Sequence, residues 1–290
     1  MKTLLILLVI SLVAGCTVSD QESRQTDVHD NMNSVLWMQT SGEHEASYRT
    51  VYRAAELQLA PLRDAGGVTG DIDQAAAYGC RAGEHCGPLA EQNLLPAVVL
   101  DIDETVLDNV IYQARLVREN REYQDATWDL WVAERKAGTV PGVIGFIEAA
   151  QRAGVAVIYL TNRSCSTRNP GGDPCPQRED TLQNMLSTGV PALGENDLFI
   201  MRNERPEWNQ SEKQLRRQFL AAKYRIMMLI GDDIGDFASG IKGLSIDERL
   251  EFVQAHAGLL GVHWFALANP VYGSWERAVP RPKVEVLITD

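Results

Sequence analysis

An apolar run at residues 97–100 ends in two aspartates, Asp101 and Asp103. The run has the composition of a buried β-strand. Because the side chains of a strand alternate with a period of two, Asp101 and Asp103 are expected to point the same way at its carboxyl end. Two carboxylates this close repel each other, so a cation or a shared proton must neutralise them, as is common in catalytic sites. The run therefore predicts a reaction centre at the end of a strand.

Further apolar runs alternate with helical patterns through the second half of the chain. Apolar strands separated by helices predict a buried parallel sheet in an α/β fold. Ligands bind at the carboxyl ends of such strands, and Asp101, Thr161 and Asp232 each follow a run directly. The expected strands are 97–101, 155–160, 197–201, 226–230 and 262–267, and the expected helices include 143–150, 214–222 and 247–257.

Two segments stand outside this alternation. A helix is expected to start at Thr40, with a capping box to Glu43 and apolar residues at helical spacing as far as Leu62. Residues 105–141 concentrate aromatic side chains directly after the acidic pair. We expect this insert and the N-terminal helices to form a helical cap over the strand ends.

The N-terminus has the pattern of a targeting segment. Lys2 precedes an apolar run at residues 4–10 that is too short to span a bilayer, so residues 1–15 are predicted to be a signal peptide. Residues 13–16 resemble the bacterial lipobox, in which Cys16 becomes the lipidated first residue; an ordinary secretory signal is the alternative. Residues 16–33 are then a flexible tether. Thr17 in place of an aspartate agrees with outer-membrane sorting in a Gram-negative host.

The remaining four cysteines form two short sequence pairs, Cys80 with Cys86 and Cys165 with Cys175. An exported compartment permits disulfides, and neither pair has the spacing of a zinc knuckle. Two disulfides are therefore predicted, with free thiols or a metal site as the alternatives.

Composition and missing motifs exclude several functions. The formal net charge of -12 is unfavourable for binding a nucleic-acid backbone. None of the five histidines lies in a metal-binding motif, which argues against a zinc hydrolase or a phosphohistidine enzyme. The chain also lacks a Gly-rich phosphate loop ending in lysine and a Gly-x-Ser-x-Gly elbow.

Four elements together resemble the haloacid dehalogenase (HAD) superfamily of phosphohydrolases. They are DIDET at residues 101–105, TNR at 161–163, Lys213, and GDDIGD at 231–236. The resemblance is strongest to the class C acid phosphatases, the lipoprotein e (P4) family of bacterial 5′-nucleotidases, and runs from about residue 37 to residue 276. It implies a Rossmann-like three-layer α/β/α core with a parallel sheet and a smaller helical cap.

The resemblance also implies roles for these residues. Asp101 is the nucleophile that forms an aspartyl-phosphate, and Asp103 protonates the leaving group and then activates water, which agrees with an acidic pH optimum. Mg²⁺ is expected on the Asp101 carboxylate, the Asp103 carbonyl and Asp232, with Asp236 supporting this set. The phosphate-binding residues are expected to be Thr161, Asn162 and Lys213, although Lys223 or a surface role for either lysine is an alternative.

Two aromatic residues match the positions that hold the nucleoside in this family, Trp128 on the insert and Tyr272 near the C-terminus. The alternative is that they only pack the cap on the core, the role we expect for Trp131. We expect structural roles for Glu104 and Asp108, and no catalytic role for Asp233.

The chain is thus expected to be a Mg²⁺-dependent acid phosphatase acting on phosphomonoesters, above all 5′-nucleotides, as an outer-membrane lipoprotein facing the periplasm. A phosphatase without nucleotide preference, a carbon–halogen hydrolase and a non-catalytic binding lipoprotein are the alternatives; Asp103 and Asp232 argue against the second. The expected partners are small phosphorylated metabolites, the membrane and a second copy of the chain, but no nucleic-acid polymer.

The expected units are residues 1–15 (signal peptide), 16–33 (tether), 34–94 (N-terminal helices packing with the cap), 95–104 and 142–280 (core), 105–141 (cap insert) and 281–290 (tail).

Overall fold

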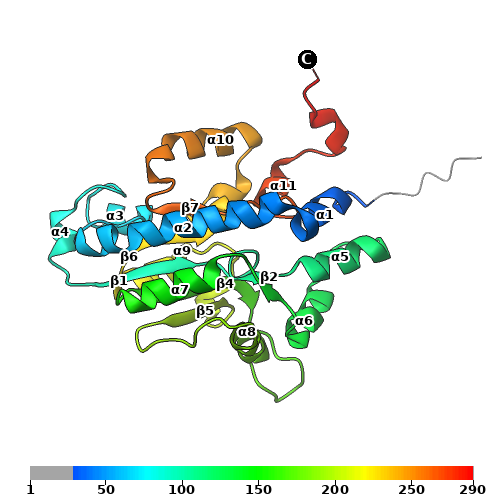
Figure 1. The fold of residues 1–290 in the computed structure, drawn as a ribbon, viewed down its shortest axis with the longest axis horizontal. Helices are drawn as coiled ribbons and strands as arrows, with labels where there is room; N and C mark the ends of the chain where they lie inside the picture. Colours follow the sequence, from blue (N-terminus) through cyan, green and yellow to red (C-terminus); the bar gives the residue numbers. More distant parts are fainter. Residues whose placement is uncertain (1–28, 290) are drawn as a thin grey trace, which may run out of the picture.

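A five-stranded parallel sheet forms the centre of the molecule, with strand order β5-β4-β1-β6-β7 (Figure 1). The structure is a computed structural model that describes residues 29–289, so the predicted signal peptide and Cys16 lie outside the described residues. The strands are β1 (Leu95–Leu100), β4 (Ala156–Ser164), β5 (Leu198–Arg202), β6 (Tyr224–Gly231) and β7 (Trp264–Ala266). The predicted parallel α/β sheet is therefore confirmed.

Helices cover both faces of this sheet. One layer contains α2 (Gly42–Asp64), α7 (Val143–Arg152) and α8 (Pro176–Ser187), and the other contains α3 (Ile72–Ala77), α9 (Gln214–Ala221) and α10 (Ile246–Ala255). The short helices are α4 (Gly87–Ala90), α11 (Ser274–Ala278) and the 3-10 turns Pro206–Trp208, Ile234–Asp236, Ile241–Gly243, Ala257–Leu259 and Lys283–Val286. The result is the expected three-layer α/β/α arrangement.

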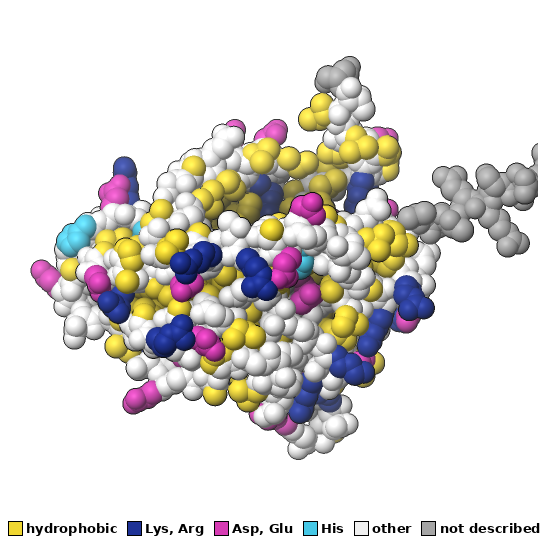
Figure 2. Space-filling view, viewed as in Figure 1, with side chains coloured by type: hydrophobic (Ala, Val, Ile, Leu, Met, Phe, Trp, Pro, Cys, Tyr) yellow, Lys and Arg dark blue, Asp and Glu magenta, His cyan; other side chains and the backbone are white. Residues whose placement is uncertain are grey.

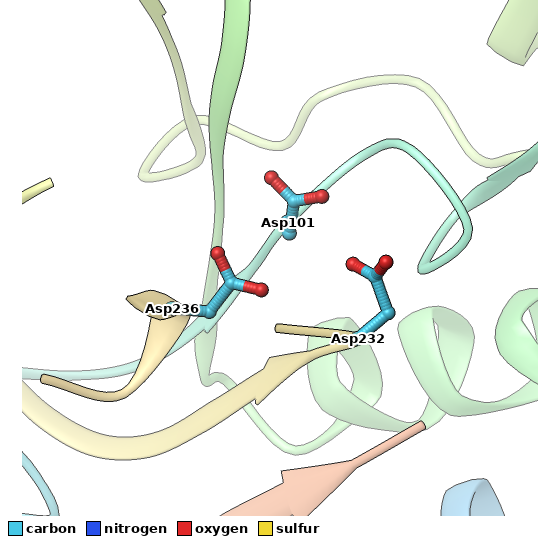
Figure 3. Close-up of side chains that lie close together, drawn as sticks. All are labelled: Asp101, Asp232 and Asp236. Atoms are coloured by element: carbon cyan, nitrogen blue, oxygen red, sulfur yellow. The ribbon is translucent and has the colours of Figure 1, made fainter. Parts of the chain in front are cut away.

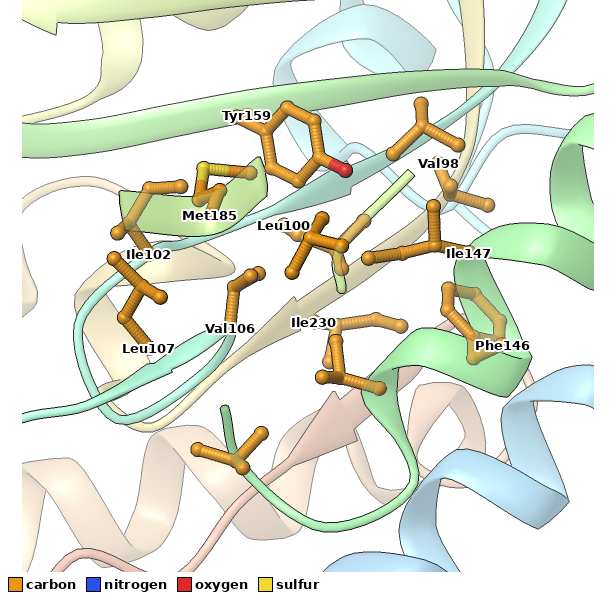
Figure 4. Packing of buried hydrophobic residues seen from close by; sticks show 14 of the residues in the cluster. Val98, Leu100, Ile102, Val106, Leu107, Phe146, Ile147, Tyr159, Met185 and Ile230 are labelled. Atoms are coloured by element: carbon orange, nitrogen blue, oxygen red, sulfur yellow. The ribbon is translucent and has the colours of Figure 1, made fainter. Parts of the chain in front are cut away.

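Strand β1 is buried on both sides because its side chains alternate between the two helix layers. Val98 and Leu100 pack in the cluster that includes Phe146 and Ile147 of α7 (Figure 4). Ala97 and Val99 pack in the opposite cluster. This two-sided burial explains why the strand is apolar at every position rather than at alternate ones.

The N-terminal region forms two helices instead of the single one predicted from Thr40. Helix α1 (Met32–Thr40) ends where Ser41 takes an extended conformation. The Ser41 side chain then accepts a hydrogen bond from the backbone N–H of His44 at 3.1 Å, so Ser41 and not Thr40 caps α2.

Only part of this region packs with the insert. Helix α1 lies against α5 (Val110–Glu119) of the insert, whereas α2 lies along α7 and β7 of the core. The apolar stripe of α2, from Tyr48 to Leu62, fills the core cluster, which explains this placement.

The insert contains α5 and α6 (Asp125–Glu134), and lies beyond the carboxyl ends of the strands with α1 (Figure 1). Its two ends are joined by a small antiparallel pair, β2 (Leu107–Asp108) and β3 (Gly138–Thr139). This pair was not predicted, since two-residue strands leave no periodic signal in the sequence. It holds the base of the cap beside the acidic run.

Both predicted cysteine pairs form disulfides in the structure. Cys80 joins Cys86 in the loop between α3 and α4, and Cys165 joins Cys175 in the loop between β4 and α8. The second bridge closes a loop that starts just after residues 161–163, so it restrains a segment that leaves the strand-end edge.

Apolar side chains gather on the surface near α10 and the C-terminal segment (Figure 2). They include Leu250, Val284, Leu287 and Ile288. Within residues 29–289, no helix combines the length and the apolar character needed to cross a bilayer.

Candidate active site

The carboxyl ends of β1, β4 and β6 bring the predicted site residues together. Asp101 directly follows β1 and Asp232 directly follows β6. Strand β4 is longer than predicted and continues to Ser164, so Thr161 and Asn162 lie within the strand instead of after it. All three strands are parallel neighbours, which is why residues far apart in sequence meet at one edge.

Three carboxylates point toward one another at this edge: Asp101, Asp232 and Asp236 (Figure 3). One oxygen from each lies within 4.8 Å of the other two. Burial raises the pKa of Asp232 well above its usual value, and the charges of Asp236 and Asp101 add to this rise. The amide of Asn269 opposes the rise by donating a 2.8 Å hydrogen bond to Asp232 Oδ2. The cluster therefore lacks positive charge.

Lys213 supplies part of that charge. Lys213 is 2% exposed, and its ammonium group contacts Asp101 Oδ1 and lies 2.7 Å from Asp236 Oδ1. Burial lowers the pKa of Lys213, but the two carboxylates outweigh this effect and hold it above its usual value. The alternative lysine, Lys223, instead lies over the Tyr224 ring at 5.0 Å.

Burial is also the main cause of a raised pKa at Asp101, and the charges of Asp236 and Asp103 contribute, whereas Lys213 opposes the rise. The single positive charge of Lys213 thus cannot balance the three neighbouring carboxylates. A further cation at the cluster would favour the ionised form of Asp101.

The carboxylate of Asp103 is held by residues outside the cluster. Arg163 donates to Asp103 Oδ1 from Nε at 3.0 Å and from Nη2 at 2.8 Å, and Asn109 Nδ2 donates to the same oxygen at 3.0 Å. Oδ2 accepts no hydrogen bond from the described part of the chain. The two aspartates thus differ in surroundings, because β1 ends at Leu100 and the strand alternation stops before Asp103.

A buried network fixes these two donors. Arg163 also donates to Thr181 Oγ1 at 3.0 Å, and the Asn109 side-chain oxygen accepts from Trp131 Nε1 at 2.9 Å. Glu104 accepts from the backbone N–H of Asn109 at 2.8 Å. Neither Arg163 nor Asn109 was assigned a role from the sequence, although Arg163 is the last residue of the TNR motif. Trp131 is buried as predicted.

Asn162 and Thr161 are both held by Arg216, a residue that sequence reasoning missed. Arg216 Nη1 donates to the Thr161 carbonyl at 2.6 Å, and Nη2 donates to Asn162 Oδ1 at 2.7 Å. Thr161 is fully buried, and its hydroxyl accepts from the backbone N–H of Arg163 at 2.9 Å. Asn162 lines the cavity above the cluster.

That cavity has a volume of about 710 Å³, within the range of ligand-binding pockets. Asp101, Asp103 and Asp232 form part of its wall, and the half-buried rings of Trp128 and Tyr272 line it as well. The Trp128 ring packs edge-on against Tyr112 with centroids 5.2 Å apart. Both predicted aromatic residues therefore border the same space as the carboxylates.

The residues predicted to be structural have local partners. Asp233 caps the turn Ile234–Asp236 and accepts from the Ser274 hydroxyl at 2.7 Å. Asp108 accepts from the backbone N–H of Val110 at 2.8 Å, at the start of α5.

The donor chemistry of the cluster fits a divalent metal ion. Carboxylate oxygens are the ligands that hard cations such as Mg²⁺ prefer. Asp101, Asp232 and Asp236 offer such oxygens close together, with too little positive charge among the neighbouring side chains to balance them.

Comparisons with known proteins agree with this geometry. Residues 19–275 match the family model of the HAD superfamily, subfamily IIIB (acid phosphatase). The structure of the class C acid phosphatase from Bacillus anthracis is similar, with 28% sequence identity and a TM-score of 0.65 over 87% of this chain and 89% of that one. The same Bacillus anthracis enzyme with tungstate bound matches with 28% identity, the same coverage and a TM-score of 0.64.

The family match covers most of the chain, and the fold agrees with that of class C acid phosphatases. HAD phosphatases generally use a divalent metal, as the carboxylate cluster suggests. The chain therefore belongs to the acid phosphatases of HAD subfamily IIIB and is a phosphoric monoester hydrolase.

Proposed function

We propose that this acid phosphatase is Mg²⁺-dependent and hydrolyses 5′-nucleotides through an aspartyl-phosphate, outside the cytoplasm. The observation that carries the proposal is the position of Asp101. It contacts a buried lysine, borders two further carboxylates and lines a cavity large enough for a nucleotide.

In the first step, a carboxylate oxygen of Asp101 attacks the substrate phosphorus, and the bond from phosphorus to the leaving oxygen breaks. Asp103 gives its proton to that oxygen. The contacts of Asp103 support this role, because Arg163 and Asn109 hold Oδ1 while Oδ2 is left without a protein donor in the described residues. In the second step, water attacks the phosphorus, Asp103 takes its proton, and the bond to Asp101 breaks to release phosphate.

Positive charge is needed around the transferred group in both steps. Lys213 supplies one charge beside Asp101. Asp101, Asp232, Asp236 and the Asp103 carbonyl are proposed to hold Mg²⁺, which when bound supplies further charge neutralisation at the phosphoryl oxygens. The Asn162 amide and the Thr161 hydroxyl are proposed to donate to the same oxygens. The tungstate bound by the Bacillus anthracis enzyme supports an oxyanion site in this fold.

The nucleotide preference rests on Trp128 and Tyr272. Both rings line the cavity that contains Asp101, and stacking on aromatic faces is a sequence-tolerant way to hold a base. A phosphatase without nucleotide preference is the alternative.

The nucleophile can be tested by replacing Asp101 with asparagine. Because the amide cannot form the acyl-phosphate, kcat for p-nitrophenyl phosphate should fall by at least about three orders of magnitude. The exposed Asp247 of α10 provides a matched control, and Asp247→Asn should retain wild-type turnover. Activity close to wild type in Asp101→Asn would refute the assigned nucleophile and favour the other carboxylates.

The metal can be tested through both stability and activity. EDTA should abolish turnover, and saturating Mg²⁺ added to the stripped protein should raise Tm by several degrees, about 5 °C, because binding stabilises only the folded state. Asp232→Asn should lose this rise, whereas Asp247→Asn should keep it. An unchanged Tm together with full activity in EDTA would contradict the metal site.

The proposed stacking of the base on Trp128 can be tested with 5′-AMP and glycerol phosphate as substrates. Trp128→Ala should raise KM for 5′-AMP by about tenfold through loss of stacking, and should leave KM for glycerol phosphate nearly unchanged. Trp275→Ala is the control, since Trp275 is 40% exposed and is not among the residues that line the cavity. Equal effects of Trp128→Ala on both substrates would show that the ring only packs the cap.

We also propose that Cys16 carries the lipid anchor of an outer-membrane lipoprotein facing the periplasm. This cysteine and the targeting pattern before it lie outside the described residues, so the proposal rests on the sequence. Labelled palmitate fed to a Gram-negative host should appear in the wild-type protein but not in Cys16→Ser. Equal labelling of the two proteins, or none in either, would reject the anchor.

A further inference from the structure

A smaller cavity of about 280 Å³ adjoins the main one on the side of β4 and β5. The two share six lining residues: Tyr123, Asp125, Trp128, Asn162, Arg163 and Arg202. The rest of the smaller cavity is largely polar. It is lined by Asp129, Val132, Ser164, Ser166, Gln177 and Asn203. The polar lining suits a hydrophilic group better than a base.

Arg202 differs from the other arginines around this cavity because its side chain lacks a partner. Arg163 binds Asp103, and Arg168 binds Asp129 and Asp180. Arg202 ends β5 and is half-buried, yet within residues 29–289 its guanidinium makes no hydrogen bond or ion pair. Its Nε is buried and unsatisfied. A buried guanidinium donor without an acceptor is unfavourable unless an absent group supplies one.

The surroundings of Arg202 add positive charge and another free donor. Burial is the main cause that lowers the pKa of Arg216 to about 10, and the charge of Arg202 contributes to this lowering. Asn162 uses its side-chain oxygen to accept from Arg216. Its Nδ2 therefore points away from Arg216, and it donates to no group in the described structure.

The acidic residues of the smaller cavity do not cancel this charge. Asp129 is neutralised by Arg168, with 2.7 Å between Arg168 Nε and Asp129 Oδ2. Asp125 lies on the exposed side of α6 and accepts from the Tyr123 hydroxyl at 2.9 Å. Asp103, which lines the main cavity, is paired with Arg163. The net result is an unpaired cation facing a polar space beside the reaction centre.

We propose that Arg202 forms a subsite for a second anionic group of the substrate. The substrate class is phosphomonoesters with a second phosphate, such as nucleoside 3′,5′-bisphosphates. The scissile phosphate lies at Asp101 and Lys213, as in the proposed function on which this inference rests. The second phosphate accepts hydrogen bonds from the Arg202 guanidinium, a planar group suited to binding phosphate through two donors. Arg202 is thus a specificity residue and takes no part in bond cleavage.

Competition against p-nitrophenyl phosphate hydrolysis tests the subsite. In the wild type, adenosine 3′,5′-bisphosphate should inhibit with a Ki about tenfold lower than that of 5′-AMP, because it adds a charge-assisted contact. Arg202→Gln should remove this preference and leave KM for p-nitrophenyl phosphate nearly unchanged, whereas Arg202→Lys should keep part of it. Arg205→Gln is the matched control: Arg205 packs on Trp208 and Phe219 and lines neither cavity.

A second pair without a base, fructose 1,6-bisphosphate and fructose 6-phosphate, separates this inference from the nucleotide preference. If neither nucleotide competes but the fructose bisphosphate is preferred and Arg202→Gln removes that preference, the nucleotide assignment fails and the subsite stands. Equal Ki values within both pairs in the wild type overturn the subsite. An equal loss for mono- and bisphosphates in Arg202→Gln also overturns it, since Arg202 would then act on the scissile phosphate or on the fold.

Discussion

The contact of Lys213 with Asp101 and Asp236 is the interaction on which the site depends. Removing one lysine and three carboxylates from water is costly, and their mutual attraction repays this only in part. Replacing such a group by apolar side chains would often make a protein more stable. The buried charges are therefore better explained by chemistry than by stability. A carboxylate that acts as the proposed nucleophile must stay ionised in a buried position. The contact with Lys213 favours this form, and a metal ion held by the neighbouring carboxylates would favour it further.

Helix α9 and Lys213, the residue just before it, carry buried positive charges that contact the site. Lys213, Arg216, Arg217 and Leu220 are all buried, and their spacing of three and four residues places them on one face of the helix. Lys213 contacts Asp101, Arg216 holds Thr161 and Asn162, and Arg217 pairs with Asp71 at 2.8 Å before α3. The face that packs on the sheet is thus cationic for most of its length. One helix thus links Asp101 after β1, the carboxyl end of β4 and helix α3 of its own layer.

The sequence is sufficient to predict the sheet, its helix layers and the meeting of Asp101 with Asp232, because apolar strands and their polar ends are local patterns. The disulfide pairs also follow from short spacing. The roles of Arg216 and Arg217 could not be predicted in this way: an arginine is usually exposed, and its burial depends on acceptors supplied by distant segments. The cap at Ser41 was missed because Thr40 and Ser41 are both good capping residues, and tertiary packing of α1 decides which one ends the helix. The β2–β3 pair was not predicted because its strands are too short to give a periodic pattern in the sequence.

Asp101 and Asp103 show that the spacing of two residues in the sequence is not enough to predict their surroundings in the site. A continuous strand would give them the same surroundings, but β1 stops at Leu100 and Glu104 takes a left-handed conformation with φ of 56°. This turn directs the two carboxylates to different partners, an ammonium group for Asp101 and a guanidinium with an amide for Asp103. Lys213 contacts two carboxylates of the cluster, Asp101 and Asp236, whereas Arg163 and Asn109 bind a single oxygen of Asp103 and the other oxygen accepts no hydrogen bond from residues 29–289. A nucleophile and a proton carrier need such unequal surroundings. The division of roles that we propose for the two aspartates therefore originates in the turn after β1 and in the residues that this turn meets, Arg163 of β4 and Asn109 just before α5.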